Sequence, residues 1–390
     1  MDIEKVKAQV CDEVETRRPQ LDELSLKIHS HPELGFQESK AAAWLTQYLK
    51  ENGFSIERGI CDLPTAFRAS YGEGKPAIAI LAEYDALPKM GHACGHNIIA
   101  ASAVGAGIAA KTATNQFGGN ILVIGTPAEE LHGGKAIMAE RGAFDHVDIA
   151  MIVHPGVRNA AAIQALACQS LEVEFFGKAV HAATRPEKGI NALEAMLQSF
   201  AAINSLRQHI KNKARIHGII TDGGEAANIV PAHSAGVFIV RAEDNTYLDE
   251  LKQKVINCFA GAATATGARL KYRWGDTRYA PMRNNLTLAR LFQQNMQSLG
   301  RKVKLADPSS AFGSTDMGNI SQLLPSIHPM VAIAPQEVVV HSTQFASAAA
   351  SEAGSHALFD AAKALAMTVV DLVANAEAVA RIKEEFHQEK

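Results

Sequence analysis

The sequence predicts an α/β fold built on a mostly parallel sheet with helices on both faces. Continuous apolar runs, which are typical of strands buried on both faces, occur at 76–82, 119–125 and 148–153. Stretches with the apolar spacing of helices separate these runs, at 98–111 and 134–142. In such a sheet, binding and catalytic groups collect at the carboxyl ends of the strands.

The chain before these runs is expected to be mainly helical. Apolar residues recur at helical intervals through the first 50 residues, at Val6, Val10, Val14, Leu21, Leu24 and Ile28. A Gly-Phe turn near Gly53 ends this stretch, and a further strand is predicted at 65–71. The Ala-rich stretch 351–382 is expected to return to helix at the other end of the chain.

The pattern changes from about Ser170 onward. Strand-like alternation and helical spacing then follow in the order strand, helix, strand, strand, helix, strand, at 171–176, 191–210, 215–221, 236–242, 248–263 and 268–274. That order is typical of a small ferredoxin-like α+β domain. We therefore predict a larger α/β domain in two halves, 1–167 and 279–390, with the small domain 168–278 inserted between them.

The composition excludes several classes of protein. The 390 residues are 47% apolar and carry a formal charge of -3, so the chain lacks the basic excess of a nucleic-acid-binding protein. The longest weakly polar run, 98–110, is too short to cross a bilayer, which takes about 20 residues. The charged start Met1–Lys5 has no readable secretory signal. We expect a cytoplasmic protein that binds neither nucleic acid nor membranes.

A candidate metal site begins with Cys94 and His96. The five cysteines are odd in number and scattered, which does not suit a disulfide framework, but Cys94 lies two residues before His96. A loop that enters a helix can direct both side chains to one point, and thiolate with imidazole suits a borderline-soft divalent metal. The alternative for this pair alone is a buried thiol beside a structural histidine.

Three further positions strengthen the metal interpretation. Glu129 and Glu130 follow the apolar run 119–125, where one could bind metal while the other acts as a general base; adjacent acids also commonly begin a solvated helix. His154 directly follows the run 148–153, and His341 follows Val338–Val340, which we predict to be a strand end. Together these positions supply enough donors for two metals with open places for water.

With these residues in view, the chain resembles the aminoacylase/carboxypeptidase-G family of dinuclear metallopeptidases, in its amidohydrolase branch. That branch includes aminobenzoyl-glutamate hydrolases and aminoacylase-like dipeptidases. The resemblance covers nearly the whole chain, through motifs at His31–Gly35, Ala82–Pro88, Gly91–Asn97, Gly125–Glu130, His154–Gly156, Gly177–Ala183 and His341.

The resemblance implies a role for each of these site residues. Two divalent ions, zinc or manganese, would be held by Cys94, His96, Glu130, His154 and His341. Cys94 would take the bridging place that other branches give to an aspartate, Glu129 would be the general base, and Asp85 would orient a ligand.

The inserted domain has an implied role as well. By resemblance it is a lid and dimerisation domain, and its His181 would stabilise the oxyanion in the site of the partner subunit of a homodimer. Asn228 and Arg241 match substrate-contacting positions of the family.

The sequence departs from the family pattern at three places. Glu83-Tyr84-Asp85 replaces the His-x-Asp of the aminopeptidase-like branches, so neither Glu83 nor Asp85 is assigned as a metal ligand, and we assign Asp85 an orienting role. Asn97 stands where many relatives have aspartate, which removes a charge. The turn Gly313–Asp316 matches a related turn of the amidohydrolase branch, but the sequence does not indicate what it contacts.

The predicted activity is hydrolysis of the amide bond of an N-acyl amino acid or a dipeptide-like small molecule by metal-activated water. Two alternatives stay open at this point. One is a cysteine hydrolase with Cys94 as nucleophile. The other is a binding or regulatory protein that keeps the fold but has lost turnover.

Overall fold

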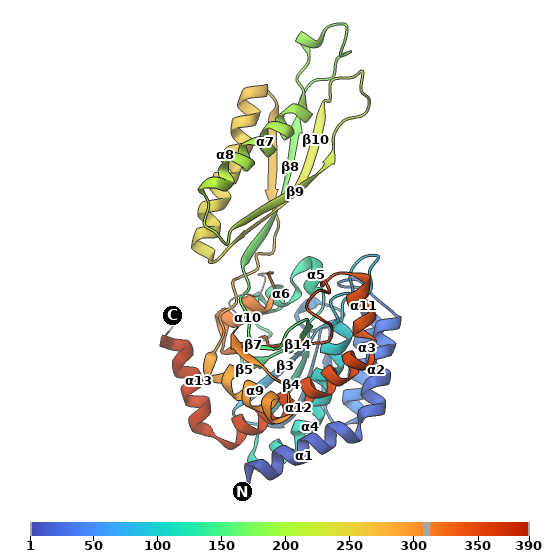
Figure 1. Cartoon of the computed structure of the whole chain (residues 1–390), viewed down its shortest axis with the longest axis vertical. Coiled ribbons are helices and arrows are strands. Elements are labelled where there is room, and N and C mark those ends of the chain that lie inside the picture. The colour runs from blue at the N-terminus through green and yellow to red at the C-terminus, as the bar shows by residue number, and fades with distance from the viewer. Residues whose placement is uncertain (1, 307–312, 389–390) are drawn as a thin grey trace. The chain divides into compact units, whose positions relative to one another are not determined.

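The computed structural model of the chain describes residues 2–306 and 313–388. The chain divides into two units (Figure 1). The first comprises Met1–Gln164, Met282–Ala311 and Asp316–Lys390, and the second comprises Ala165–Pro281 with Phe312–Thr315.

A mixed sheet forms the centre of the first unit, with strand order β1-β2-β4-β3-β5-β13. Its strands are β1 (Ser55–Arg58), β2 (Phe67–Glu73), β3 (Ala77–Ala82), β4 (Gly119–Gly125), β5 (Ile149–Met151) and β13 (Ser326–Ile327). β3 pairs in parallel with β4 and β5, and β5 pairs in parallel with β13, whereas β2 is antiparallel to β1 and β4. The apolar runs therefore form the predicted parallel centre, and their carboxyl ends lie at one edge.

A smaller sheet of the first unit has the order β12-β7-β14-β6. Its strands are β12 (Lys304–Ala306), β7 (Ala160–Ala162), β14 (Met330–Ala332) and β6 (His154–Gly156). β6 runs parallel to β14, so that His154 pairs with Met330. His154 thus begins a strand of this second sheet, rather than simply ending the run 148–153.

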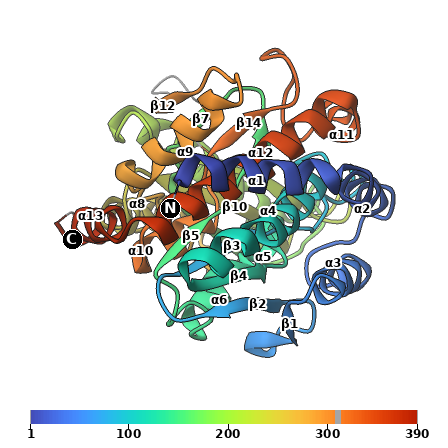
Figure 2. The same ribbon diagram turned by 90° about the horizontal axis from the view of Figure 1, so that it is seen from below.

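Helices enclose both sheets. They are α1 (Ile3–Thr16), α2 (Arg18–Ser30), α3 (Ser39–Glu51), α4 (His96–Phe117), α5 (Glu129–His132), α6 (Gly134–Glu140), α9 (Leu286–Ser298), α10 (Met317–Leu323), α11 (Thr343–Ala349), α12 (Glu352–Ala374) and α13 (Ala376–Gln388). The first 50 residues therefore form three helices. Figure 2 shows α1 lying along α12, with α4 beside them.

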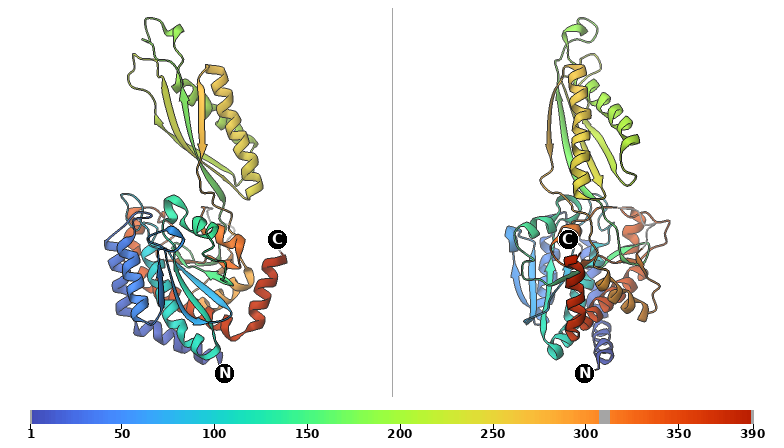
Figure 3. Two further views of the ribbon diagram at one scale, coloured as in Figure 1. Left: turned by 180° about the vertical axis from the view of Figure 1, so that it is seen from behind. Right: turned by 90° about the vertical axis from the view of Figure 1, so that its left-hand side faces the viewer.

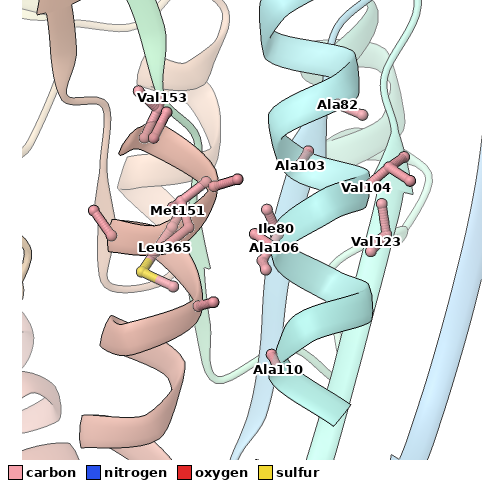
Figure 4. Close-up of a cluster of buried hydrophobic side chains, with 14 of the residues drawn as sticks. Ile80, Ala82, Ala103, Val104, Ala106, Ala110, Val123, Met151, Val153 and Leu365 are labelled. Atoms are coloured by element: carbon pink, nitrogen blue, oxygen red, sulfur yellow. The ribbon is translucent and has the colours of Figure 1, made fainter. Parts of the chain in front are cut away.

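Helix α4 is buried on nearly all sides, because it packs between β3 and β4 on one side and α12 on the other (Figure 4). Its small residues permit this close approach. A Cβ on Gly107 would overlap Val123 Cγ2, and one on Gly105 would come within 2.8 Å of Leu21 Cδ1. Along the described chain, no helix combines the length and apolarity needed to cross a membrane.

The second unit contains an antiparallel sheet with the order β11-β8-β10-β9, and α7 and α8 cover one of its faces (Figure 3). The elements are β8 (Ala167–Phe176), α7 (Ala192–Leu206), β9 (Arg215–Asp222), β10 (His233–Ala242), α8 (Asn245–Thr266) and β11 (Arg269–Trp274). Alternate residues of β8, such as Leu171, Val173 and Phe175, are buried beneath the helices. The predicted α/β class is confirmed.

One predicted strand is wrong. Val338–Val340 lies in a loop between β14 and α11, and His341 at its end has a left-handed backbone with φ of 64°. The three valines are β-branched, which favours extended structure, but the described segment has no neighbouring strand with which to pair.

The contact of α12 with α4 generates a stability prediction. Leu365 is fully buried in this contact (Figure 4), so Leu365→Ala should lower the free energy of unfolding by about 2–5 kcal/mol through the lost transfer energy and the cavity left behind. The matched control is Leu26→Ala in α2, because Leu26 is 48% exposed. This substitution should change the free energy of unfolding by less than about 0.5 kcal/mol. Urea denaturation measures both, and equal losses would contradict the assignment of this core.

Candidate metal centre

The loop after β3 places Cys94 and His96 where β6 begins. Gly95, between them, has φ of 79°, and a Cβ on it would lie 2.5 Å from Pro155 Cγ. Only glycine therefore allows the loop to pass this close to β6. The result is a distance of 3.4 Å between Cys94 Sγ and His154 Nε2.

Asp85 orients one imidazole and one backbone amide of the centre. His96 Nδ1 lies 3.1 Å from Asp85 Oδ1 and 2.9 Å from the Asp85 carbonyl oxygen. Both of these atoms are acceptors, so Nδ1 carries a proton and only Nε2 is available to a metal. The other oxygen, Oδ2, accepts a hydrogen bond from the amide of Glu130 at 3.0 Å. Asp85 therefore joins the ring of His96 to the backbone of Glu130.

The adjacent glutamates begin α5 after a strained turn. Ala128 has a left-handed φ of 61°, and its amide donates to Glu38 Oε1 at 2.8 Å. The other oxygen of Glu38 accepts from the hydroxyl of Thr65 at 2.9 Å. Glu38 is fully buried, and burial raises the pKa of its carboxyl to about 7. This carboxyl therefore supports the backbone immediately before Glu129.

Two histidines complete the group from other parts of the first unit. His154 Nδ1 donates to the Pro155 carbonyl at 2.7 Å, which leaves Nε2 as an acceptor directed at Cys94. His341 Nε2 lies 3.6 Å from Glu130 Oε1, and its side chain is 47% exposed. His341 reaches the site from a loop rather than from the predicted strand end.

The donor atoms form three overlapping groups, in each of which all atoms lie within 4.8 Å of one another. The groups are Cys94–His96–His154, Cys94–Glu130–His341 and His96–Glu129–Glu130. Within the described chain, His96 Nε2 and Glu130 Oε1 are buried and have no hydrogen-bond partner. Buried polar atoms are normally satisfied, so a cation bound among these donors fits the residues present.

The electrostatics distinguish the roles of the donors. Burial, reinforced by the charge of Glu130, raises the pKa of the Cys94 thiol, whereas a nucleophilic cysteine needs a lowered pKa. Burial lowers the pKa of His154 to about 4, so its imidazole is neutral, as a metal ligand must be. Burial and the neighbouring charges of Asp316 and Glu83 raise the pKa of Glu129, which makes this carboxyl more basic than an ordinary glutamate.

Sequence reasoning missed two groups near these donors. One is Glu38, whose side chain supports Ala128. The other is the buried set Glu83, Lys135 and Asp316, in which Lys135 Nζ lies 2.6 Å from a carboxylate oxygen of each acid. The turn Gly313–Asp316 thus contacts α6 through Asp316. Lys135 follows Gly133-Gly134 in a short helix, and no spacing rule marks such a lysine as buried.

The predicted residues of the second unit lie on adjoining segments. His181 bridges to Ile229, and the amide of Ala182 donates to the Asn228 carbonyl at 2.9 Å. The amide of Ala183 donates to His181 Nδ1 at 3.2 Å, so the ring proton lies on Nε2. Arg241 lies on β10 and donates from Nη1 to Ser314 Oγ at 2.6 Å.

An α/β unit that gathers thiol, imidazole and carboxylate donors beside a second glutamate defines a metal-dependent hydrolase. The chain belongs to peptidase family M20/M25/M40, whose family model matches residues 79–364. It is thus a metallopeptidase-type enzyme that hydrolyses amide bonds, and the predicted resemblance and enzyme class are confirmed. Neither the cysteine hydrolase nor the silent homologue is supported.

Named relatives fall in the same group. The chain is 35% identical to Xaa-Arg dipeptidase of Mus musculus over 99% of its own length and 93% of the relative. It is 33% identical to Xaa-Arg dipeptidase of Homo sapiens with the same coverage. It is also 34% identical to one of the subunits of p-aminobenzoyl-glutamate hydrolase of Escherichia coli, over 75% of this chain and 65% of the relative.

Solved structures share the fold at low sequence identity. A Bacillus subtilis protein described as a dinuclear metal binding peptidase from the M20 family matches with a TM-score of 0.72 at 20% identity, over 92% of this chain and 99% of that one. An aminobenzoyl-glutamate utilization protein from Klebsiella pneumoniae matches with a TM-score of 0.71 at 19% identity, over 93% and 98%.

Proposed function

We propose that this enzyme is a dipeptidase that also accepts N-acyl amino acids. The observation that carries the proposal is the convergence of Cys94, His96, Glu130 and His154 beside Glu129. The two relatives named Xaa-Arg dipeptidase match 99% of the chain and make a dipeptide ending in arginine the first substrate to test. The Escherichia coli relative supports p-aminobenzoyl-glutamate as the second.

The proposed cofactor is a pair of divalent ions in each protomer. Cys94 belongs to two of the three donor groups, one with His96 and His154 and one with Glu130 and His341. Cys94, His96, Glu130, His154 and His341 would hold the two ions. Thiolate with imidazole favours zinc, whereas the carboxylates also permit manganese.

The chemistry follows from the groups around these donors. When bound, the ions supply Lewis acidity, which polarises the scissile carbonyl and makes water acidic enough to attack near neutral pH. Glu129 accepts the proton of the attacking water as the new carbon–oxygen bond forms. It then returns this proton to the leaving nitrogen as the carbon–nitrogen bond breaks, so the products are a carboxylic acid and an amine, which ionise to a carboxylate and an ammonium group near neutral pH.

The second unit is proposed to contribute to the site of a partner protomer in a homodimer. The hydrogen bond from the Ala183 amide leaves His181 with its proton on Nε2, so this atom can donate to the oxyanion that forms on the substrate carbonyl. Asn228, on the segment that pairs with His181, and Arg241 would contact the substrate. Domain limits of 1–167, 168–278 and 279–390 remain the proposed division between catalytic halves and lid.

Metal removal tests the proposed function. Dialysis against a chelator should abolish hydrolysis of an alanyl-arginine dipeptide, and added zinc or manganese should restore it, because the ions supply the Lewis acid. Release of the free C-terminal amino acid measures the rate. Alanyl-glutamate is the matched control, because it replaces the basic residue with an acidic one. Activity that survives complete metal removal would refute the metal mechanism, and equal rates on both dipeptides would refute the arginine preference.

Substitution of Glu129 tests the assignment of the base. Glu129→Gln keeps the size of the side chain but removes its ability to accept a proton, so kcat should fall by about 100-fold or more. The metal content, measured by mass spectrometry, should stay normal because Glu130 remains. Glu130→Gln is the control and should lose metal. A Glu129→Gln enzyme with a near-normal rate would exclude Glu129 as the base.

Mixed oligomers test the role of His181. His181→Ala alone should lower kcat by about 100- to 1,000-fold through loss of an oxyanion donor. If His181 acts across a twofold interface, mixing this variant with Glu129→Gln gives heterodimers with one intact site, and activity should return to about a quarter of the wild-type value. Unfolding and refolding the mixture allows the protomers to exchange. No recovery in a mixture shown to contain heterodimers would exclude the role across the interface.

A further inference from the structure

A buried set of three charged side chains, Glu83, Lys135 and Asp316, lies against the metal-binding donors. All three side chains are fully buried. Lys135 Nζ is 2.6 Å from Glu83 Oε1 and 2.6 Å from Asp316 Oδ1. Asp316 Oδ2 accepts the backbone amide of Lys135 at 2.8 Å as well, so this carboxylate holds the lysine at two points.

These residues come from three separate elements of the first unit. Glu83 follows β3, Lys135 lies in the first turn of α6, and Asp316 immediately precedes α10. Removing charges from water is costly, and a buried ion pair often contributes little net stability. A purely structural link between α6 and α10 could be made by apolar side chains instead. The position of the third member, Glu83, indicates a more specific role.

Glu83 divides its two oxygens between Lys135 and the metal site. Oε1 faces the ammonium of Lys135, while Oε2 lies 3.5 Å from His96 Nε2, the nitrogen left free for a metal. The ammonium of Lys135, at 2.6 Å from Oε1, stabilises the charged form of the Glu83 carboxyl. Glu83 is therefore a carboxylate, held by one oxygen, whose other oxygen faces the donors.

We propose that Lys135 is a positioning residue of the metal centre, which with Asp316 fixes the Glu83 carboxylate beside His96 so that its negative charge favours a divalent cation there. The proposal rests on the metal centre proposed above and assigns it an outer carboxylate beyond the ligand set. The lysine acts through Glu83 and does not contact the ion. The three charges together leave one net negative charge next to the donors.

Zinc affinity of the apoenzyme tests this role without relying on turnover. Competition with a colorimetric zinc chelator should give a 10- to 100-fold weaker affinity for Glu83→Gln, roughly the size of effect typical of outer-shell partners. Lys135→Met, which keeps the length of the side chain, should weaken binding in the same range because Glu83 loses its anchor. The double variant should bind no more weakly than the weaker single variant, since both changes act through one carboxylate.

The matched control is Lys7→Met. Lys7 also forms a largely buried ion pair, with its Nζ 2.7 Å from Asp371 Oδ1, but this pair joins α1 to α12. The Lys7→Met variant should have a lower melting temperature and an unchanged zinc affinity. Lys135→Met affinity within twofold of wild type would mean that the triad is only structural, and would overturn the proposal. Tighter zinc binding by Lys135→Met would also overturn the proposal, because Lys135 would then act only as a charge that repels the cation.

Two outcomes separate this proposal from the one on which it rests. A wild-type protein that binds neither zinc nor manganese would refute the metal centre itself. Normal wild-type binding with unchanged affinity in Glu83→Gln would refute only the role of the triad. If Lys135→Met does not fold, Glu83→Gln still decides the matter, because the substituted amide keeps an oxygen for Lys135 and leaves the Lys135–Asp316 pair in place.

Discussion

Asp85 joins the two elements that carry the candidate metal ligands His96 and Glu130. It is fully buried, and its carboxylate joins the ring of His96, at the start of α4, to the backbone of Glu130, in α5. An unpaired buried carboxylate would cost several kcal/mol, so the two elements must meet at this residue. Glu38 acts in the same way, since it holds Ala128 in its left-handed conformation. The positions of His96, Glu130 and the backbone before Glu129 thus depend on two buried acids, Asp85 and Glu38.

Close backbone approach is the second requirement. Gly95 passes against Pro155, and Gly134 lies so near Pro127 that a Cβ there would overlap the carbonyl oxygen. The first contact brings Cys94 to His154, and the second turns the chain from α5 into α6. That turn points Lys135 into the interior. The glycine pair Gly133-Gly134, which in the sequence indicates only the end of a helix, therefore places a positive charge near the donors.

Much of this centre could be predicted from the sequence, for a reason that is local. The glutamate pair and His154 directly follow strongly apolar runs, Cys94 and His96 lie in the loop that leads from another such run into α4, and parallel strands bring these ends to one edge. The same rule failed for Val338–Val340, because β-propensity without a pairing partner does not make a strand. The position of residues at strand ends also does not predict Lys135, since a lysine after two glycines normally points to solvent. Its partner Asp316 is 181 residues away, and only the packing of α10 on α6 brings them together.

The balance of charge explains why such a site suits a pair of ions. Glu129, Glu130, Asp85, Glu83 and Asp316 gather in the buried interior around the thiol of Cys94, and Lys135 is the one buried lysine in the described part of the chain. Without cations, some of these groups must take up protons, which agrees with the raised pKa values of Cys94 and Glu129. Two divalent ions would offset most of this excess negative charge and allow the thiol to ionise. Metal binding and the protonation of Glu129 are then coupled, so that the residue proposed as the base becomes an effective acceptor when the ions are bound.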